Sequence, residues 1–242
     1  MIVIFTDFGL SGPYTGQMKA VLLQWAPAVP IVDLIADAPM FNPVASAQLL
    51  AAYSSTFPVG TVFLCVVDPG VGGDRLPLVI RADGRYFVGP DNGLFHRLIK
   101  QSKTIDAWQI SYRPEHLSTS FHGRDLFAPV AAILAQGEPV PGERVAEADL
   151  FGYDWPRSLQ EVVYIDHYGN AITGLDSSDI SVDCRLEVGG MELRYAPTFT
   201  KVEPNGLFWY LNSSDLVEIA QNGASAAHTL KLQIGSSIRL NH

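Results

Sequence analysis

Short apolar runs alternate with stretches of helical spacing along the first 135 residues of the chain. The apolar runs have strand length and are rich in β-branched side chains, and Asp83-Gly84 between two of them is a hairpin signal. The predicted strands are residues 2–6, 30–35, 62–67, 78–82 and 86–88, and the predicted helices are residues 16–25, 44–53, 94–100 and 126–135. Strands separated by helices predict an α/β domain over residues 1–150, with a mainly parallel sheet covered on both faces.

The pattern changes after residue 136. Residues 137–159 contain three prolines and a cluster of acidic residues, which predicts a linker. Beyond them the apolar runs are short and separated by turn residues, and Gly189-Gly190 is a hairpin signal. These runs are residues 162–165, 185–188, 192–195, 207–211, 216–219 and 230–234. They predict a small all-β, barrel-like domain over residues 160–242.

Composition and charge narrow the class of protein. Apolar residues make up 48% and charged residues 17%, which supports a packed core and excludes a disordered tail or a coiled coil. A net charge of −9 argues against nucleic acid or an anionic membrane as a partner. No apolar run approaches the ~18 residues of a membrane helix. The N-terminal MIVIFTDFG lacks a preceding basic region, so we expect a strand there and not a signal peptide.

The two cysteines add a prediction of location. Cys65 and Cys184 lie far apart in apolar or strand-like sequence. They cannot build a disulfide framework or a four-ligand metal site, and we expect both to be buried. The sequence therefore predicts a cytoplasmic protein.

Polar side chains cluster where the predicted strands end. Asp7 follows the first strand, Asp68 ends the third, and Arg75 lies in the same loop as Asp68. Residues 89–93 close another strand, and residues 119–125 precede a helix. Because ligands bind outside the carboxyl ends of strands in α/β sheets, this placement predicts a ligand-binding domain.

Each cluster also has a simpler interpretation. Asp7 is a possible helix cap, and residues 90–93 form a good turn sequence. His122 is compatible with a structural hydrogen bond, and Arg124 with Asp125 is compatible with a local ion pair. No dinucleotide, P-loop or nucleophile-elbow motif occurs, and the histidine spacing matches no metal site.

Six segments together resemble one enzyme family, the S-adenosylmethionine hydroxide adenosyltransferases. These enzymes are relatives of the fluorinating and chlorinating enzymes that act on the same substrate. The segments are TDFG (6–9), VVDPGVGGDR (66–75), GPDNGLF (89–95), FHGRDLFAP (121–129), IDHYGN (165–170) and LNSSDLVEIAQNGASA (211–226). They occur in order and cover nearly the whole chain.

The resemblance implies a reaction and an assembly. Water, or formally hydroxide, attacks C5′ of S-adenosylmethionine and yields adenosine and L-methionine, without a metal or redox cofactor. The family has an N-terminal α/β domain and a C-terminal barrel-like domain. Its members form homotrimers, with each active site between one subunit's N-terminal domain and a neighbour's C-terminal domain.

The family's catalytic Asp-Arg-His set corresponds to Asp68, Arg75 and His122. Because a sulfonium is already a good leaving group, the reaction needs a positioned nucleophile and removal of its proton. We interpret the three side chains as one polarising unit and leave open which of them takes the proton.

The resemblance also implies eight substrate contacts. Asp7 would bind the ribose hydroxyls, Phe41 would lie along the ribose, and Phe199 would stack on adenine. The remaining contacts are Asp166 and Asn170 with Ser213 for the methionine ammonium and carboxylate, and Asn222 and Ala224 for the adenine edge. The family has an arginine near Ser213, but this chain reads Ser213-Ser214-Asp215. Core packing remains the alternative for Phe41 and Phe199, and a hairpin turn for residues 166–170.

Two alternative functions remain open at this point. A non-catalytic protein that binds adenosine or S-adenosylmethionine would not need Asp68, Arg75 and His122 together. A halogenase would carry tyrosine in place of Asp68 and a serine in place of Gly123. The charge of Asp68 would oppose halide binding by several kcal/mol in a low dielectric, which favours water as the nucleophile.

Overall fold

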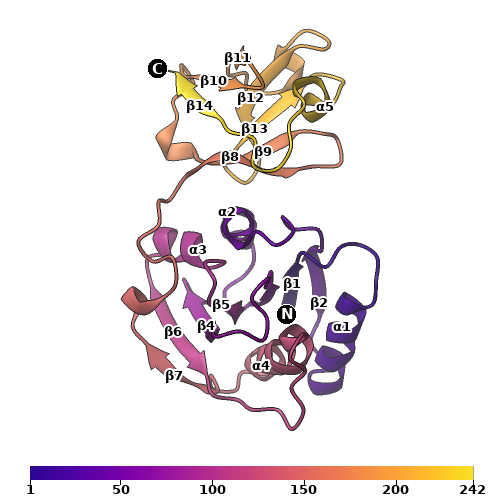
Figure 1. The fold of residues 1–242 in the computed structure, drawn as a ribbon, viewed down its shortest axis with the longest axis vertical. Helices are drawn as coiled ribbons and strands as arrows, with labels where there is room; N and C mark the ends of the chain where they lie inside the picture. Colours follow the sequence, from indigo (N-terminus) through magenta and orange to yellow (C-terminus); the bar gives the residue numbers. More distant parts are fainter. Residues whose placement is uncertain (242) are drawn as a thin grey trace. The chain divides into compact units, whose positions relative to one another are not determined.

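The computed structural model describes residues 1–241, and the chain divides into two compact units, Met1–Trp155 and Pro156–His242 (Figure 1). A seven-stranded sheet with the order β2-β1-β3-β5-β4-β6-β7 forms the centre of the first unit. Its strands are β1 (Ile2–Thr6), β2 (Ile31–Ile35), β3 (Val62–Val66), β4 (Pro77–Ala82), β5 (Arg85–Pro90), β6 (Ile105–Ile110) and β7 (Gly142–Val145).

The α/β prediction for this unit is confirmed, and the sheet has a parallel and an antiparallel part. Strands β2, β1, β3 and β5 run parallel, whereas β4, β6 and β7 are added in antiparallel pairings. The change of direction begins at Asp83-Gly84, where both residues have positive φ and join β4 to β5 in the predicted hairpin. Strand β6, which the sequence analysis omitted, continues this antiparallel part.

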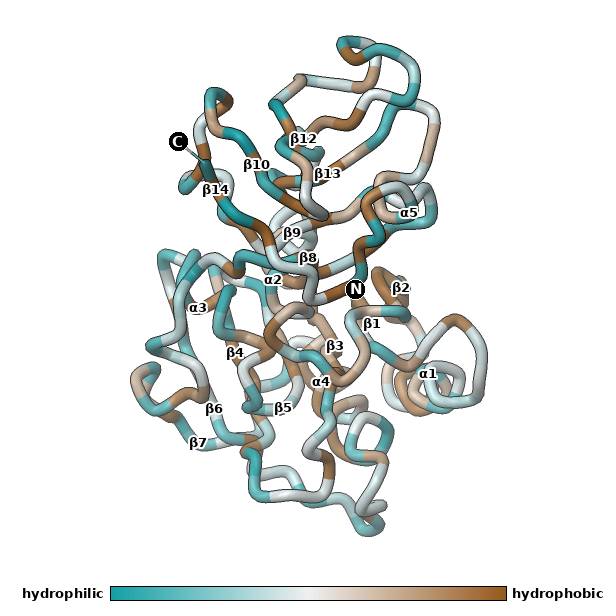
Figure 2. Tube along the Cα trace, turned by 45° about the horizontal axis from the view of Figure 1, so that its top comes forward, coloured by the Kyte–Doolittle hydropathy of each residue, from teal (hydrophilic) through white to brown (hydrophobic). Residues whose placement is uncertain are grey.

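Helices cover both faces of the sheet (Figure 1). Helices α1 (Tyr14–Trp25) and α4 (Ala128–Ala135) pack together on one face, and α2 (Pro43–Ser54) and α3 (His96–Gln101) pack together on the other. Side chains alternate between these faces along each strand, so Ile2 and Ile4 join the core beneath α1 and α4. Figure 2 shows hydrophobic stretches recurring along the strands and hydrophilic ones in many of the connecting loops.

The interpretation of residues 137–159 as a linker is wrong for most of their length. Strand β7 pairs with β6, and the N–H of Phe151 donates to Asp91 at 3.0 Å. The ring of Trp155 lies 5.4 Å from that of His96. Prolines and acidic residues are compatible with an edge strand, because one side of its backbone faces away from the sheet.

The second unit is built from two antiparallel sheets, which confirms the all-β prediction. One sheet has the order β12-β13-β9-β8 and the other β11-β10-β14. The elements are β8 (Leu159–Ile165), β9 (Ala171–Asp176), β10 (Arg185–Val188), β11 (Met191–Leu193), β12 (Leu207–Leu211), β13 (Leu216–Gln221), α5 (Ala226–Leu230) and β14 (Arg239–Asn241). Trp209 is the largest side chain fully buried in its core.

Residues 230–234 differ from the predicted strand. Leu230 ends α5, and Lys231 follows in a left-handed conformation that caps this helix. Short apolar runs of helix and strand cannot be distinguished by periodicity alone. None of the helices in the described part of the chain has the length and apolar character needed to cross a membrane.

Candidate active site

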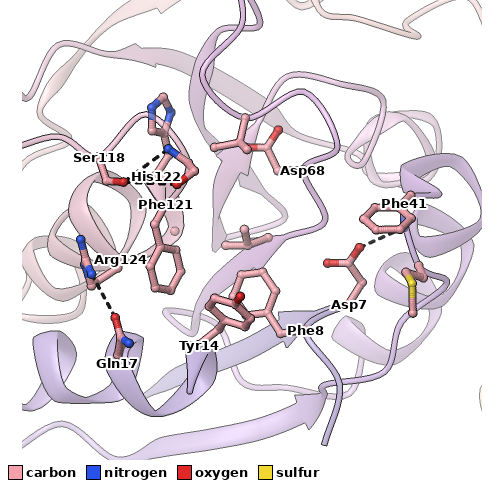
Figure 3. Close-up of a pocket in the computed structure, with 15 residues that line it drawn as sticks. Asp7, Phe8, Tyr14, Gln17, Phe41, Asp68, Ser118, Phe121, His122 and Arg124 are labelled. Carbon is pink, nitrogen blue, oxygen red and sulfur yellow. Dashed lines mark hydrogen bonds between the residues drawn. The ribbon is translucent and has the colours of Figure 1, made fainter. Parts of the chain in front are cut away.

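A cavity of about 690 Å³ opens in the first unit, at the carboxyl end of its parallel strands (Figure 3). Strands β1 and β3 are neighbours in register, with Thr6 opposite Val66, so the residues that follow them emerge side by side. Asp7 and Asp68 both line the cavity. Most of the remaining lining comes from α1, from the loop that contains Phe41, and from residues 118–124. The cavity is therefore located where the topology of the sheet predicts a ligand site.

Asp68, Arg75 and His122 come together at this cavity. Arg75 donates from Nε to both Asp68 carboxylate oxygens, at 3.0 and 3.1 Å, and from Nη2 to Oδ2 at 2.5 Å. The same Nη2 lies 2.9 Å from Nδ1 of His122. The side chains of Asp68 and Arg75 are only 4% and 10% exposed, so water screens this ion pair poorly.

Asp68 and His122 line the cavity, whereas Arg75 lies behind them with its guanidinium 5.4 Å from the ring of Phe127. Arg75 thus contacts one carboxylate and one imidazole at the same time and orients both toward the same space. Gly72 helps to bring the two loops together. It has a φ of +78°, and a Cβ there would lie 2.4 Å from the carbonyl oxygen of Thr119.

The contact with Arg75 determines the protonation of His122. Arginine has donors only, so Nδ1 of His122 must be the acceptor. The imidazole is therefore neutral, with its proton on Nε2. Burial, followed by the positive charge of Arg75, lowers the pKa of His122, in agreement with this assignment. Nε2 of His122 is therefore left to donate a hydrogen bond, whereas the oxygens of the Asp68 carboxylate accept hydrogen bonds.

Asp7 organises the loop that contains Phe41, the residue expected beside it at the site. Its Oδ2 accepts the N–H of Phe41 at 3.0 Å, and Phe41 has a φ of 56°, which is unusual for an aromatic residue. Burial raises the pKa of Asp7, and the charge of Asp68 adds to this effect. The capping alternative for Asp7 is wrong, because α1 begins after Pro13 without a side-chain cap. Core packing is wrong for Phe41, which is 70% exposed.

Two groups of lining residues were missed by the sequence analysis. The rings of Phe8, Tyr14 and Phe121 form a triangle, with centroid distances of 5.6, 5.9 and 5.6 Å. Arg124 forms the expected ion pair with Asp125, at 2.6 Å, and also lines the cavity. Phe8 and Phe121 belong to the quoted motifs. Their position next to Asp7 and His122 was the only feature of the sequence that indicated a place in the cavity lining.

In the second unit, Asp166 and Asn170 are held by one turn. Asp166 accepts the backbone N–H groups of Tyr168 and Asn170 at 2.9 and 2.8 Å, and its Oδ2 accepts Nδ2 of Asn170 at 2.9 Å. Gly169 between them has a φ of 82°. The hairpin-turn interpretation of these residues is correct, and the Asp166 carboxylate keeps acceptor capacity beyond these bonds.

Ser213 lies in the turn between β12 and β13, near a buried acid that the sequence analysis missed. Asn212 accepts the N–H groups of Ser214 and Leu216 at 2.9 and 3.1 Å. Glu218 in turn accepts Nδ2 of Asn212 at 2.8 Å and the hydroxyl of Tyr210 at 2.6 Å. Burial raises the pKa of Glu218, and the charge of Asp166 contributes in the same direction.

The predicted adenine contacts also belong to the second unit. Phe199 packs edge-to-face with Phe208 and Tyr210 and is partly buried, so the core-packing alternative holds for it. The side chain of Asn222 donates to the carbonyl of Val202 at 2.7 Å. Ala224 is exposed in the turn after β13.

Among residues 1–241, no group of three His, Cys, Asp or Glu side chains is arranged to hold a metal ion. The chemistry that the cavity offers is that of a neutral histidine donor, an ionisable carboxylate and an arginine that orients both.

Comparison with known proteins gives consistent matches over both units. Residues 2–143 match the N-terminal domain of S-adenosylmethionine hydroxide adenosyltransferases, and residues 160–239 match their C-terminal domain. The chain is 37% identical to an (R)-S-adenosyl-L-methionine hydrolase of Thermus thermophilus, over 99% of this chain and 98% of that protein. It is 32% identical to a protein of the same name from Salinispora arenicola, over 97% and 95%.

More distant relatives and solved structures extend this comparison. A fluorinase of Nocardia brasiliensis is 25% identical over 99% of this chain and 96% of the enzyme. An uncharacterised conserved protein from Thermotoga maritima superposes with a TM-score of 0.88 and 30% identity, with complete coverage of both chains. A conserved hypothetical protein from Thermus thermophilus superposes with a TM-score of 0.79 and 34% identity, over 99% of each chain.

Proposed function

Because the chain belongs to the S-adenosylmethionine hydroxide adenosyltransferase family and hydrolyses S-adenosylmethionine to adenosine and L-methionine, we propose that Asp68, Arg75 and His122 form its catalytic centre. One observation carries this proposal. A buried arginine holds a carboxylate and a neutral imidazole at the wall of the same cavity. A protein that only stores or senses the nucleoside has no need of this arrangement.

The reaction forms a bond between a water oxygen and C5′ while the C5′–S bond breaks. The bonding electrons remain on sulfur, which becomes the neutral thioether of methionine, and the water proton passes to Asp68. Positioning accounts for much of the catalysis, because the leaving group needs no protonation. The Nε2–H of His122 orients the nucleophile or a substrate oxygen beside Asp68. Asp7 accepts hydrogen bonds from the ribose hydroxyls, next to Phe41.

We also propose that no metal or redox cofactor takes part. The sulfonium already carries the positive charge that a Lewis acid would otherwise supply, and hydrolysis changes no oxidation state. Exhaustive dialysis against a chelator should therefore leave turnover unchanged, and a loss restored by one added metal would contradict this proposal.

Water, and not a halide, is the proposed nucleophile. The Asp68 carboxylate lines the cavity, and its charge opposes entry of an anion. A Cβ at Gly123 would lie 3.2 Å from Sδ of Met18 and 3.3 Å from Cγ1 of Val66, so a serine has little room there. The hydrolases among the relatives are also more similar to this chain than the fluorinases are.

The names of the hydrolase relatives specify the (R) epimer, and we propose that this chain also prefers it. Purified protein is incubated with each sulfonium epimer separately, and adenosine and methionine are followed by chromatography, with an Asp68→Ala variant as control. Turnover of the (R) epimer that disappears in this variant is expected. Equal turnover by the variant would refute the assigned centre. Tight calorimetric binding without products would favour the non-catalytic alternative.

We further propose a cytoplasmic homotrimer in which a neighbour's C-terminal domain completes each site. The apolar side chains of Leu10, Met40 and Phe41 are 87%, 67% and 70% exposed in the single chain, which supports a protein partner near the cavity. In this arrangement Asp166, Asn170, Ser213, Asn222 and Ala224 would bind the methionyl and adenine groups. Light scattering that shows an active, stable monomer would refute the shared site.

A further inference from the structure

The cavity has two chemically different ends (Figure 3). Asp7 and Phe41 lie at one side, and Arg124, Gln17 and Ser118 lie at the other. Among the lining residues of the described chain, Arg124 is the only one with a permanent positive charge. The end opposite the proposed ribose contact is therefore suited to an anionic group.

Arg124 is fixed in this position by three kinds of contact. It donates to Asp125 from Nε at 2.6 Å and from Nη2 at 3.0 Å, and its guanidinium lies 5.0 Å from the ring of Phe121. Its Nη1 donates to Oε1 of Gln17 at 3.0 Å. These bonds use three of its five N–H groups, so two are left for a ligand. The bond to Arg124 also orients the side-chain amide of Gln17. Its oxygen accepts from Arg124, so its N–H groups are left to donate to a ligand.

The turn that the family resemblance assigns to the methionyl group has the opposite character. Residues 211–216 contain no lysine or arginine, and the turn reads Ser213-Ser214-Asp215. Glu218 is bonded to Asn212 of this turn and feels the charge of Asp166. Such surroundings favour the ammonium of methionine and disfavour its carboxylate.

We propose that Arg124, together with Gln17, binds the carboxylate of the methionyl group of the substrate. This inference rests on the proposed active site and deepens it. The methionyl group of S-adenosylmethionine carries a carboxylate, and Arg124 is the permanent cation among the lining residues of the cavity. Arg124 replaces, from the N-terminal domain, the cation that is absent next to Ser213. A guanidinium suits this task because its planar fork matches a carboxylate.

The test compares two substrates with two enzymes. The substrates are S-adenosylmethionine, as the epimer that the wild type hydrolyses, and its decarboxylated analogue, which keeps the sulfonium and the amine. The enzymes are the wild type and Arg124→Met. Loss of a charge-assisted bond should lower kcat/KM about 10- to 100-fold when either the carboxylate or Arg124 is removed. Removing both should cost no more than removing one, since the interaction is already absent.

Two further variants separate binding from folding. Gln17→Glu leaves the Arg124–Asp125 pair in place and adds a negative charge beside the carboxylate, so it should impair the intact substrate and spare the decarboxylated one. Arg144→Met is the matched control, because Arg144 also pairs with an aspartate and covers an aromatic ring, Trp108, but does not line the cavity. It should not change either rate.

The outcomes separate the two proposals. Equal loss on both substrates in Arg124→Met and in Gln17→Glu would refute the carboxylate contact and indicate a structural role. Equal kcat/KM of the wild type for the two substrates would refute it as well. Absence of turnover of S-adenosylmethionine by the wild type would instead contradict the proposed active site itself.

Discussion

Asp68→Asn is the most informative single substitution, because it changes charge and hydrogen bonding with almost no change of shape. Arg75 donates to both carboxylate oxygens of Asp68. Whichever way the new amide is turned, its NH2 group therefore faces an N–H of Arg75. The guanidinium, 10% exposed, loses its counter-charge, and one partner of a buried pair is missing. Breaking such a pair costs about 3–5 kcal/mol, and we expect about 3 kcal/mol because the amide oxygen still accepts one bond.

The same substitution removes the proposed proton acceptor. General-base catalysis contributes about 10²–10⁴-fold to the rate, so kcat/KM should fall at least 100-fold. This fall is larger than the loss of activity that partial unfolding of the variant would cause. Thermal unfolding measures stability, with about 2–4 °C per kcal/mol expected for a chain of this size. Chromatography of adenosine measures activity on the fraction that circular dichroism shows to be folded.

Asp106→Asn is the matched control for both measurements. Asp106 accepts from Arg144 at 2.8 Å, in a pair whose arginine side chain is 70% exposed. Exposed pairs contribute less than about 1 kcal/mol, so stability and turnover should remain close to wild type. The reasoning is refuted if Asp68→Asn keeps turnover within tenfold of wild type, or if it is no less stable than the control.

Three further outcomes follow from the geometry of the cavity. We expect the neutral form of His122 to be the active one, and the pKa of His122 lies below the ordinary value. The value of kcat/KM should therefore stay constant as the pH falls to about 6.5 and decline only below that pH. A decline that begins above about pH 7 would contradict this prediction. Asp7→Asn should raise KM about tenfold with a smaller change in kcat, because a charge-assisted bond to a ribose hydroxyl becomes a neutral one; an unchanged KM in steady-state kinetics would argue against the ribose contact. Gly72→Ala should reduce both melting temperature and activity more than Gly60→Ala, because both residues have positive φ but only at Gly72 would the new Cβ lie 2.4 Å from a backbone oxygen. Equal effects of the two substitutions would show that the close approach is unimportant.

Local periodicity was sufficient for much of the fold because strands and helices leave short-range patterns in the sequence. The buried runs before Asp7 and Asp68 are continuous and β-branched, and parallel neighbours of this kind place their next residues side by side. The prediction of a ligand site at this edge follows from topology alone. The local pattern was ambiguous at residues 230–234 and 142–145, and there the neighbouring segments of the chain decided which secondary structure formed. Residues 142–145 become a strand only because β6 offers a free edge.

The sequence by itself determined which chemical groups the chain carries and on which loops they lie, since motif composition and strand ends are local properties. Only the tertiary structure decided that Arg75 stands behind Asp68 and makes Nδ1 of His122 an acceptor. It also decided that Gln17 and Arg124, 107 positions apart, meet at one end of the cavity. These contacts depend on how loops close over one another, and loop closure is set by the packing of the whole domain and not by the spacing of neighbouring residues.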